Sequence, residues 1–500
     1  MTRRWSRETT ILIAIALATV LLHALTNRQY GFHRDELQTV DDGQHLDWGY
    51  VAYPPLTPFL ARLAFTLFGP SLVGLRFFSS VAIGVAIVLA GWMARAMGGG
   101  RVAQVVAALA VAIGPVALSA GALFQYVAFD FLWWVAIAYF TIRLVKSEDP
   151  RWWLAIGAAI GLAMLTKYTI GVLVIGLAVG VVLTPARRYL TSPWLWAGAA
   201  LALLIFLPNA IWQIRHEFIS LDFLSSIHAR DVRIGRTKNF LIDQFLVAAS
   251  PFTIPLWMGG LWRLFSHDGK QFRITGWMFL TAFLLFWALQ GRGYYMAPAY
   301  PMLLASGAMA VERRIIAASE RGRNLRILGW SALAVAGAAL VIAVVIPIPP
   351  VGSRWWNLSN QVQDDWREEV GWPDLVAEVA RVRDSLPVEE RSRVTVLAGN
   401  YGEAGAIDLY GASYGLPRVI CNTNSFWLRG FSEPEPGTLI VTGVSRSYLE
   451  RHFESVELAG HVRNRYGLLN EETKYHPDIF VCRGLRESWQ EFWKHFKNYG

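Results

Sequence analysis

Residues 31–36 read Gly31-Phe32-His33-Arg34-Asp35-Glu36 and follow directly on the first long apolar segment of the chain, which ends near residue 26. Four consecutive ionisable side chains beside a hydrocarbon layer are costly unless they lie at the water boundary and have a function there. We therefore interpret this stretch as a functional corner on the surface of a membrane-embedded helical scaffold. An ordinary cluster of solvated interfacial charges is the alternative.

The composition of the whole chain is that of a membrane protein. Of its 500 residues, 54% are hydrophobic and only 17% are charged, whereas about a quarter of the residues in a soluble domain are charged. The 22 Trp, 17 Tyr and 27 Phe residues fit aromatic belts at two membrane interfaces. Basic cytoplasmic loops explain the net charge of +9, and because no nucleic-acid-binding motif is present, no nucleic-acid partner is expected.

Apolar segments long enough to span about 30 Å of hydrocarbon recur along the first 350 residues. They predict about eleven transmembrane helices, at residues 9–26, 72–97, 101–121, 124–145, 152–166, 168–184, 193–212, 241–263, 274–290, 294–311 and 326–348. The basic residues 1–7 before an apolar run resemble a signal peptide, but no small-residue cleavage site follows, so we predict an uncleaved first helix that begins in the cytoplasm. The predicted domains are a transmembrane domain over residues 1–350 and a soluble domain over residues 351–500.

Basic residues assign the loops to the two sides of the membrane. With the N-terminus inside, the predicted inner loops carry clusters of Arg and Lys, as the positive-inside rule requires. The first outer loop is then residues 27–71. A second outer loop, residues 213–240, departs from the rule because it is basic; it holds Arg215, His228, Arg230, Arg233, Arg236 and Lys238. It is expected to bind an anionic lipid headgroup or to act as a mobile lid, and a surface amphipathic helix is the alternative.

Beyond residue 350 the chain becomes polar. Residues 374–386 predict an amphipathic helix that Pro387 ends, and β-branched runs at 394–397, 417–420, 438–441 and 479–481 predict strands. This alternation predicts a small α/β domain on the outer side, in which residues 400–407 form a strand-to-helix turn; substrate contact by that turn is the alternative. Its cysteines, Cys421 and Cys482, allow a disulfide in an exported domain, but their spacing does not decide it.

The first outer loop continues as His45-Leu46-Asp47-Trp48-Gly49-Tyr50 and later as Pro54-Pro55-Leu56-Thr57-Pro58. Together with the run from His33 to Glu36, these motifs resemble glycosyltransferase family 39 of bacteria. Those proteins are GT-C-type membrane enzymes related to protein O-mannosyltransferases and to the lipid A aminoarabinose transferase. The resemblance extends through residues 129–130, 165–168, 292–301 and 400–407, and so covers nearly the whole chain.

The resemblance implies a GT-C-like polytopic helical protein of the inner (plasma) membrane, with its active site and its α/β domain on the extracytoplasmic side. It implies an inverting enzyme that moves a sugar from a polyprenyl phosphate to a lipid, glycan or protein acceptor. Membrane lipids are expected as further partners. A carboxylate must take the acceptor's proton on the sugar face opposite the leaving group, and Asp35 is the expected base. A flippase of lipid-linked sugars and a non-catalytic cell-envelope assembly subunit are the other hypotheses. Charges that cluster on one membrane face favour the enzyme.

Two further carboxylates are catalytic candidates. The resemblance places a second acidic residue at Asp130, although a carboxylate stabilised by a helix dipole is the alternative. Glu36 is expected to hold a metal, to hold Arg34 or to orient the acceptor. A divalent metal ion is therefore left open, with Asp35 and Glu36 as candidate ligands, and no other cofactor is expected.

Cationic and aromatic side chains complete the candidate site. Lys167 lies in an apolar stretch, where a lipid phosphate is a natural partner and a snorkelling lysine is the alternative. Arg292 beside two tyrosines is expected to hold the same phosphate, with an ordinary belt anchor as the alternative. The expected substrate-binding residues are His33, Arg34, Tyr53, Lys167, Tyr168, His228, Arg230, Arg233, Arg292, Tyr294 and Tyr295.

Overall fold

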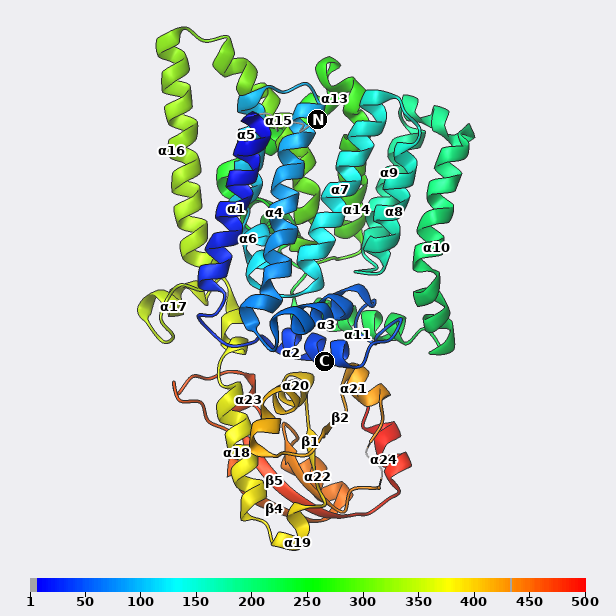
Figure 1. The fold of residues 1–500 in the computed structure, drawn as a ribbon, viewed down its shortest axis with the longest axis vertical. Coiled ribbons are helices and arrows are strands. Elements are labelled where there is room, and N and C mark those ends of the chain that lie inside the picture. The colour runs from blue at the N-terminus through cyan, green and yellow to red at the C-terminus, as the bar shows by residue number, and fades with distance from the viewer. Residues whose placement is uncertain (1–6, 432–433) are drawn as a thin grey trace.

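The computed structural model describes residues 7–431 and 434–500, so the basic start at residues 1–6 lies outside the described residues. Figure 1 shows a bundle of long helices with a smaller domain attached to one end. The bundle contains α1 (Arg7–Thr26), α4 (Leu72–Ala96), α5 (Arg101–Ala112), α6 (Pro115–Ala122), α7 (Tyr126–Ser147), α8 (Trp152–Met164), α9 (Ile170–Val182), α10 (Pro193–Arg215), α12 (Phe240–Leu246), α13 (Ile254–Phe265), α14 (Arg273–Ala288), α15 (Tyr300–Ile316) and α16 (Glu320–Val345). Short 3-10 helices interrupt it at Pro185–Thr191, Pro251–Thr253, His267–Phe272 and Gly293–Ala299.

Every predicted apolar segment is helical, but not every one is a full span. Five helices of the described chain are long and apolar enough to cross a membrane alone, namely α1, α4, α7, α10 and α16. Three bent pairs raise the number to eight if each pair is one span, and one of them bends by 59° between α5 and α6. That bend falls at Gly114-Pro115, where proline begins a new helix because it has no N–H to donate. The predicted count of eleven also includes α8, α14 and α15, which have 13, 16 and 17 residues; that count stays a prediction.

Both predicted outer loops contain helices, and the helix in the basic loop agrees with the surface-helix alternative for that segment. The first holds α2 (Arg34–Gln44) and α3 (Leu56–Phe68), and the basic loop holds α11 (Ile219–Ile234). Helix α2 begins with a capping box: the Asp35 N–H donates to the His33 side chain, and the His33 N–H donates to Glu36 at 2.8 Å. The charged run is therefore the first turn of a helix. In Figure 1 these helices lie across the end of the bundle, next to the smaller domain.

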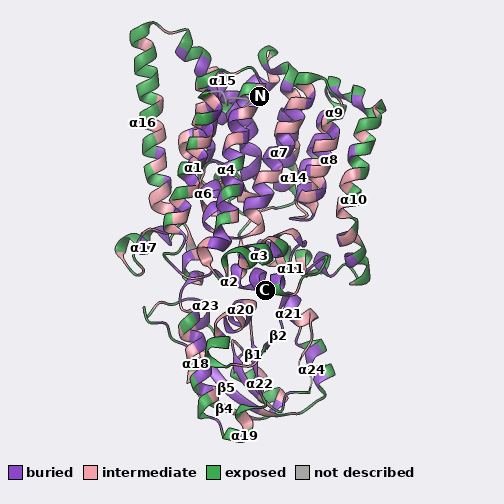
Figure 2. Cartoon of the chain, viewed as in Figure 1, coloured by how far each residue is buried: buried purple, intermediate pink, exposed green. Residues whose placement is uncertain are grey.

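Burial separates the core from the outer surface of the bundle. Figure 2 shows buried residues along the inner helices and around α2, whereas α10 and α16 at the two sides are largely exposed. Only 11% of the apolar window of α10 and of α16 is buried, and leucines such as Leu203 and Leu328 are well exposed. Apolar helices without a protein partner are expected to face lipid, because lipid tails are as apolar as leucine.

The C-terminal domain is an α/β unit, as predicted. Its strands are β1 (Val394–Ala398), β2 (Val419–Cys421), β3 (Thr438–Thr442), β4 (Phe453–His461) and β5 (Asp478–Leu485), in the order β2-β1-β3-β5-β4. β1 is parallel to β2 and β3, whereas β5 is antiparallel to β3 and β4. Its helices are α17 (Arg354–Ser359), α18 (Trp372–Ser385), α19 (Val388–Arg391), α20 (Tyr401–Tyr410), α21 (Asn424–Leu428), α22 (Arg446–His452), α23 (Glu471–Lys474) and α24 (Trp489–His495), with 3-10 turns at Asp364–Glu369 and Gly411–Tyr414.

Two details of this domain differ from, or add to, the sequence prediction. Strand β4 was not predicted because its side chains are mostly polar or half exposed, so it lacks a continuous apolar run. Cys421 and Cys482 are both buried free thiols. They lie on β2 and β5, which β1 and β3 separate in the sheet, and so they do not form the disulfide that their location allowed.

The C-terminal domain packs tightly on α2. A Cβ atom added at Gly405 of α20 would lie 2.8 Å from backbone atoms of Leu37, so the two helices touch backbone to backbone. The Arg429 guanidinium forms ion pairs with both Asp41 and Asp42. Helix α2 is thus held between the bundle and the domain, and its first turn lies where the two parts meet.

Candidate functional site

A cavity of about 850 Å³ lies at the junction of the bundle and the C-terminal domain. Its wall combines the first turn of α2, the start of α7, the break between α8 and α9, part of α11 and the segment around residues 292–295. The C-terminal domain contributes residues that follow β1, β2 and β3. Of the residues predicted for the site, all line this cavity except Glu36, Asp130, His228 and Arg233.

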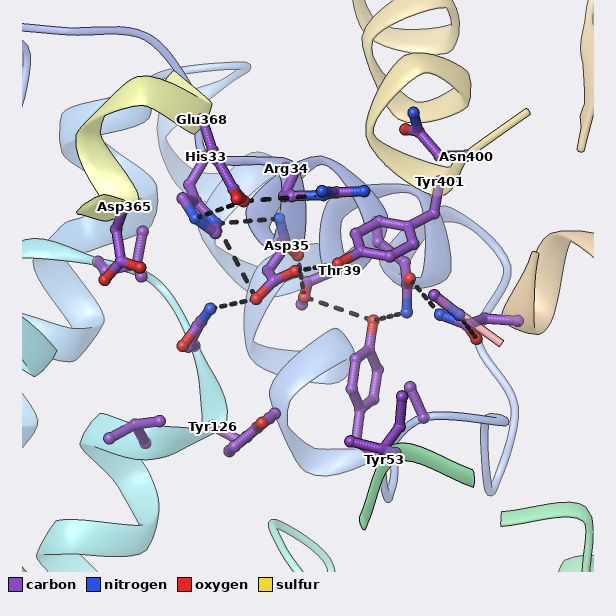
Figure 3. Close-up of a pocket in the computed structure, with 18 of the residues that line it drawn as sticks. His33, Arg34, Asp35, Thr39, Tyr53, Tyr126, Asp365, Glu368, Asn400 and Tyr401 are labelled. Carbon is purple, nitrogen blue, oxygen red and sulfur yellow. Dashed lines mark hydrogen bonds and ion pairs between the residues drawn. The ribbon is translucent and has the colours of Figure 1, made fainter. Parts of the chain in front are cut away.

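Asp35 presents a partly exposed carboxylate to the cavity. Its side chain is 39% exposed, and both of its oxygens accept hydrogen bonds. The Tyr401 hydroxyl donates to Oδ1 at 2.7 Å, and the Gln125 side-chain amide donates to Oδ2 at 2.5 Å. Figure 3 shows Tyr401 reaching this carboxylate from α20. The bundle and the C-terminal domain therefore hold one carboxylate from two sides and leave it open to solvent.

His33 and Arg34 connect α2 to the C-terminal domain. The His33 Nε2 atom lies 3.4 Å from Glu368, and the Arg34 Nε atom lies 3.8 Å from the same carboxylate. Arg34 also pairs with Glu471 and stacks on the Tyr401 ring, 4.7 Å from its centroid. Figure 3 shows Glu368 facing both His33 and Arg34. These contacts position the turn that carries Asp35.

Glu36 is a structural residue by its contacts. Its carboxylate is fully buried and receives hydrogen bonds from Arg76 at 2.7 and 2.8 Å and from the Phe124 N–H at 2.8 Å. Arg76 continues the network to Glu369 at 3.1 Å. Glu36 thus pairs with Arg76 rather than with Arg34, and its oxygens are occupied. No group of three or more His, Cys, Asp and Glu side chains suited to a metal was found in residues 7–431 and 434–500; a metal ion stays a prediction.

Lys167 lies at the break between α8 and α9, inside a cage of tyrosines. Its ammonium lies 4.1 Å from the ring centroid of Tyr295, 4.8 Å from that of Tyr126 and 5.7 Å from that of Tyr294. Cation–π attraction holds a charge without neutralising it. Asp130 is buried in α7 and interacts electrostatically with Lys167, but it does not line the cavity.

The segment predicted as a basic loop contributes unevenly. Arg230 lines the cavity, and its buried Nε atom has no hydrogen-bond partner among the described residues. Arg292 is paired with Asp231 of α11 at 2.6 Å, so it fastens α11 to the bundle as well as facing the cavity. His228 and Arg233 are exposed and point elsewhere than the cavity wall.

Two predicted aromatic residues line the cavity with their hydroxyls already bonded. The Tyr53 hydroxyl donates to Asp42 at 2.7 Å, and the Tyr168 hydroxyl donates to Asn209 at 2.9 Å. Their rings rather than their hydroxyls are therefore left for a ligand.

Two residues that hold Asp35, Tyr401 and Gln125, were not predicted from the sequence. Gln125 is an unremarkable polar residue at the start of a helix. Tyr401 lies in the predicted strand-to-helix turn, in which Asn400 caps α20 by accepting from the Glu403 N–H at 2.9 Å. This turn lines the cavity, so substrate contact by it stays a prediction. The resemblance of residues 400–407 to the family was the available signal. Only folding brings Tyr401 next to Asp35, which lies 366 residues earlier in the chain.

We expect the Tyr401→Phe variant to lower any turnover that depends on the Asp35 carboxylate by roughly tenfold, because a hydrogen bond to a charged group is lost. The Michaelis constants should change little, since the ring and its stacking on Arg34 remain. Steady-state kinetics of the purified chain measure this. Tyr414→Phe, at an exposed tyrosine of the same domain, is the matched control. A change confined to the Michaelis constants would contradict the positioning role.

Buried ionisable groups at the junction predict that stability falls as pH rises. Burial raises the pKa of Glu369 and Glu472 from 4.5 to about 7 and that of Glu403 from 4.5 to about 8. For His33, burial lowers the pKa, but Glu368 and Asp35 outweigh it and raise the pKa from 6.5 to about 10. In each case the folded chain binds more protons than the unfolded chain between the two values, so the free energy of unfolding decreases through that range.

The thermal midpoint of the detergent-solubilised chain should therefore fall between about pH 6 and about pH 9. Glu403→Gln should flatten the dependence, because the glutamine does not titrate. A midpoint that rises over this range would contradict the assignment.

Comparison with known proteins agrees with this architecture. A family model described as dolichyl-phosphate-mannose-protein mannosyltransferase matches residues 52–212. The lipid A galacturonosyltransferase RgtD of Rhizobium johnstonii is 28% identical over 234 residues, which are 45% of this chain and 48% of the relative. The chain thus spans about half the length of the curated relative it matches.

Solved structures are similar over more of the chain. ArnT from Cupriavidus metallidurans, bound to undecaprenyl phosphate, superposes with a TM-score of 0.58 at 17% identity and covers 95% of this chain and 97% of that one. The Archaeoglobus fulgidus oligosaccharyltransferase gives a TM-score of 0.52 at 12% identity, covering 83% of this chain and 64% of that one.

The helical bundle, the cavity at its end and the small C-terminal sheet define a multi-pass membrane protein with the GT-C fold. These similarities support the resemblance to GT-C glycosyltransferases that the sequence motifs indicate.

Proposed function

We propose that this protein is an inverting glycosyltransferase that uses a polyprenyl-phosphate sugar as donor and Asp35 as general base. One observation carries the proposal. A partly exposed carboxylate, held by Tyr401 and Gln125, shares one cavity with the caged ammonium of Lys167. A base beside a site for phosphate is the arrangement that a transfer from a sugar phosphate requires.

The residues divide the reaction between them. The acceptor hydroxyl gives its proton to Asp35 as its oxygen bonds to the anomeric carbon of the sugar. The bond from that carbon to the phosphate oxygen breaks, and the polyprenyl phosphate leaves with the electron pair on the opposite face. Lys167, with Arg230 and Arg292, stabilises the negative charge that the leaving phosphate gains. Glu36 acts only through the position of the α2 turn.

Several features support a lipid-linked donor. The cavity lies at one end of the apolar bundle, where a membrane lipid can present its headgroup. The structurally similar ArnT was solved with undecaprenyl phosphate bound, and the curated relative is named for transfer of galacturonic acid to lipid A. We further propose that the cavity faces the extracytoplasmic side of the inner membrane, because the predicted inner loops carry the clustered basic residues.

Sealed proteoliposomes test this proposal. A radiolabelled sugar on a polyprenyl phosphate should pass to an acceptor fraction from the cell envelope, whereas the same sugar on a nucleotide should not. Label that crosses the bilayer without changing its carrier would instead identify a flippase. If no polyprenyl-phosphate sugar is either transferred or moved across the bilayer, the non-catalytic assembly subunit is the remaining hypothesis.

We expect Lys167→Met to raise the Michaelis constant for the donor by roughly tenfold or more, because a charge-assisted contact to phosphate is lost. The methionine keeps the length of the side chain within the tyrosine cage. Lys494→Met, at an exposed lysine of α24, controls for the loss of one positive charge. An unchanged Michaelis constant for the donor would show that Lys167 does not hold its phosphate.

A further inference from the structure

The parallel strands of the C-terminal domain point their carboxyl ends into the cavity. From β1 the chain passes through α20 to β2 on one side, and β3 lies on the other side of β1. The gap between β1 and β3 is thus the point where the strand order changes direction. In open α/β sheets, ligands bind in the crevice outside the carboxyl ends of the strands at such a point. The residues after these strands, Gly399 and Gly443, both line the cavity.

The crevice has a floor of backbone and carboxylate. A Cβ atom at Gly443 would lie 2.2 Å from Oε2 of Glu403, and one at Gly399 would lie 2.1 Å from the carbonyl oxygen of Gly443. Gly443 also has φ = 71°, which a residue with a side chain rarely adopts. Only glycine fits at either position, because the ends of β1 and β3 and the Glu403 carboxylate pack closely against one another.

Acidic side chains line this crevice. Glu403 is fully buried and accepts hydrogen bonds from the Gly399 N–H at 3.1 Å and from Thr442 at 3.3 Å. Glu472 is 4% exposed, and its Oε2 atom has no hydrogen-bond partner among the described residues. Glu471, which also lines the cavity, is paired with Arg34.

These acidic side chains favour a ligand that donates hydrogen bonds. Leaving a buried carboxylate oxygen without a partner costs more free energy than a typical hydrogen bond contributes. A hydroxyl or ammonium group that donates to this oxygen removes that cost. Burial raises the pKa of both Glu403 and Glu472, so a cation or hydrogen-bond donor beside them favours their charged forms, whereas an anion opposes ionisation.

We propose that this acidic crevice, formed by Glu403, Glu471 and Glu472 at the ends of β1 and β3, is a subsite for a sugar unit without negative charge that donates hydroxyl or amino hydrogen bonds. The inference rests on the proposed function, and it names the class of sugar that one substrate carries. The cationic residues Lys167 and Arg230 come from the bundle, whereas the cation beside the crevice, Arg34, is paired with Glu471. Phosphate binds towards the bundle and the uncharged or cationic sugar towards the C-terminal domain.

Three monosaccharides of similar size test the charge preference by saturation-transfer NMR with the full chain in lipid nanodiscs. Glucosamine should bind most tightly, methyl glucoside more weakly, and glucuronate too weakly to detect. Glu472→Gln should weaken glucosamine roughly tenfold, since a charge-assisted bond becomes a neutral one, and should affect methyl glucoside less. Glu389→Gln, at an exposed glutamate of α19, is the control. Thermal unfolding shows that each variant is folded.

Glucuronate binding as tight as that of glucosamine would overturn the proposal, as would a folded Glu472→Gln variant with unchanged affinities. Competition then identifies the source of the sugar. Displacement of glucosamine by the complete polyprenyl-phosphate sugar, but not by polyprenyl phosphate alone, assigns the subsite to the donor. Displacement by neither assigns it to the acceptor, and displacement by polyprenyl phosphate alone overturns the proposal.

These measurements need no turnover. If the chain transfers no sugar but still binds glucosamine more tightly than glucuronate, the proposed function is rejected and the proposed subsite is supported.

Discussion

Replacing Asp35 by asparagine is expected to lower sugar transfer by about 10²–10⁴-fold, the usual contribution of a positioned general base. The amide has the size of the carboxylate and still offers an oxygen to Tyr401, but it cannot accept the acceptor's proton. Donor affinity should remain close to that of the parent chain, because the cationic residues of the bundle are untouched. The measurement is transfer from a radiolabelled polyprenyl-phosphate sugar, together with binding of the unlabelled donor.

The control for this variant is Asp384→Asn, at an exposed aspartate of α18 that pairs with its neighbour Arg383. It should leave transfer as it is in the parent chain. If Asp35→Asn also retained full transfer, the assignment of the base would be wrong, and Asp130 would become the next carboxylate to replace. Lost transfer together with lost donor binding would point to a folding defect instead of a missing base.

Replacing Arg76 by methionine is expected to destabilise the chain by roughly 3–5 kcal/mol, because one partner of a buried ion-pair network is removed. Arg76 is fully buried and contacts Glu36 at 2.7 Å and Glu369 at 3.1 Å. Without it, two buried carboxylates face each other uncompensated at the junction. The turn carrying Asp35 should loosen with them, so transfer should fall as well.

The two buried thiols provide the readout for this variant. A thiol-reactive dye reports their exposure on heating, since Cys421 and Cys482 are both buried in the folded domain. Arg446→Met breaks an exposed pair with Glu450 and should change stability by at most about 1 kcal/mol. Combining Arg76→Met with Glu36→Gln should recover part of the loss. Equal midpoints for Arg76→Met and Arg446→Met would contradict the structural role of the network.

Much of the bundle follows from the sequence because hydrophobic length is a local property. Every predicted apolar segment is helical, and the four predicted strands are present. The structure adds detail where length alone is ambiguous. A bend at Gly114-Pro115 lies within one predicted span, and the capping box of His33 and Glu36 begins a helix within a predicted outer loop. A three-residue spacing of polar residues carries the second signal, but a membrane-boundary charge cluster has the same appearance.

The position of the functional corner, residues 31–36, could be predicted from the sequence, but the contacts of its side chains could not. Asp35, Lys167 and Arg292 could be selected because ionisable residues next to apolar segments are costly without a function. The neighbours Asp35 and Glu36 could not be told apart, since both are carboxylates in one charged run. Folding separates them: one turn of helix directs Glu36 inwards to Arg76 and leaves Asp35 at the cavity.

The run from His33 to Glu36 by itself determined that a charged corner borders the first apolar helix, because the cost of its charges in hydrocarbon depends only on nearby residues. The tertiary structure alone decided that Tyr401, 366 residues away, holds the Asp35 carboxylate, and that Glu403 and Glu472 share its cavity. Contacts between the bundle and the C-terminal domain depend on how two separately patterned units pack, and no local pattern in either one records that packing.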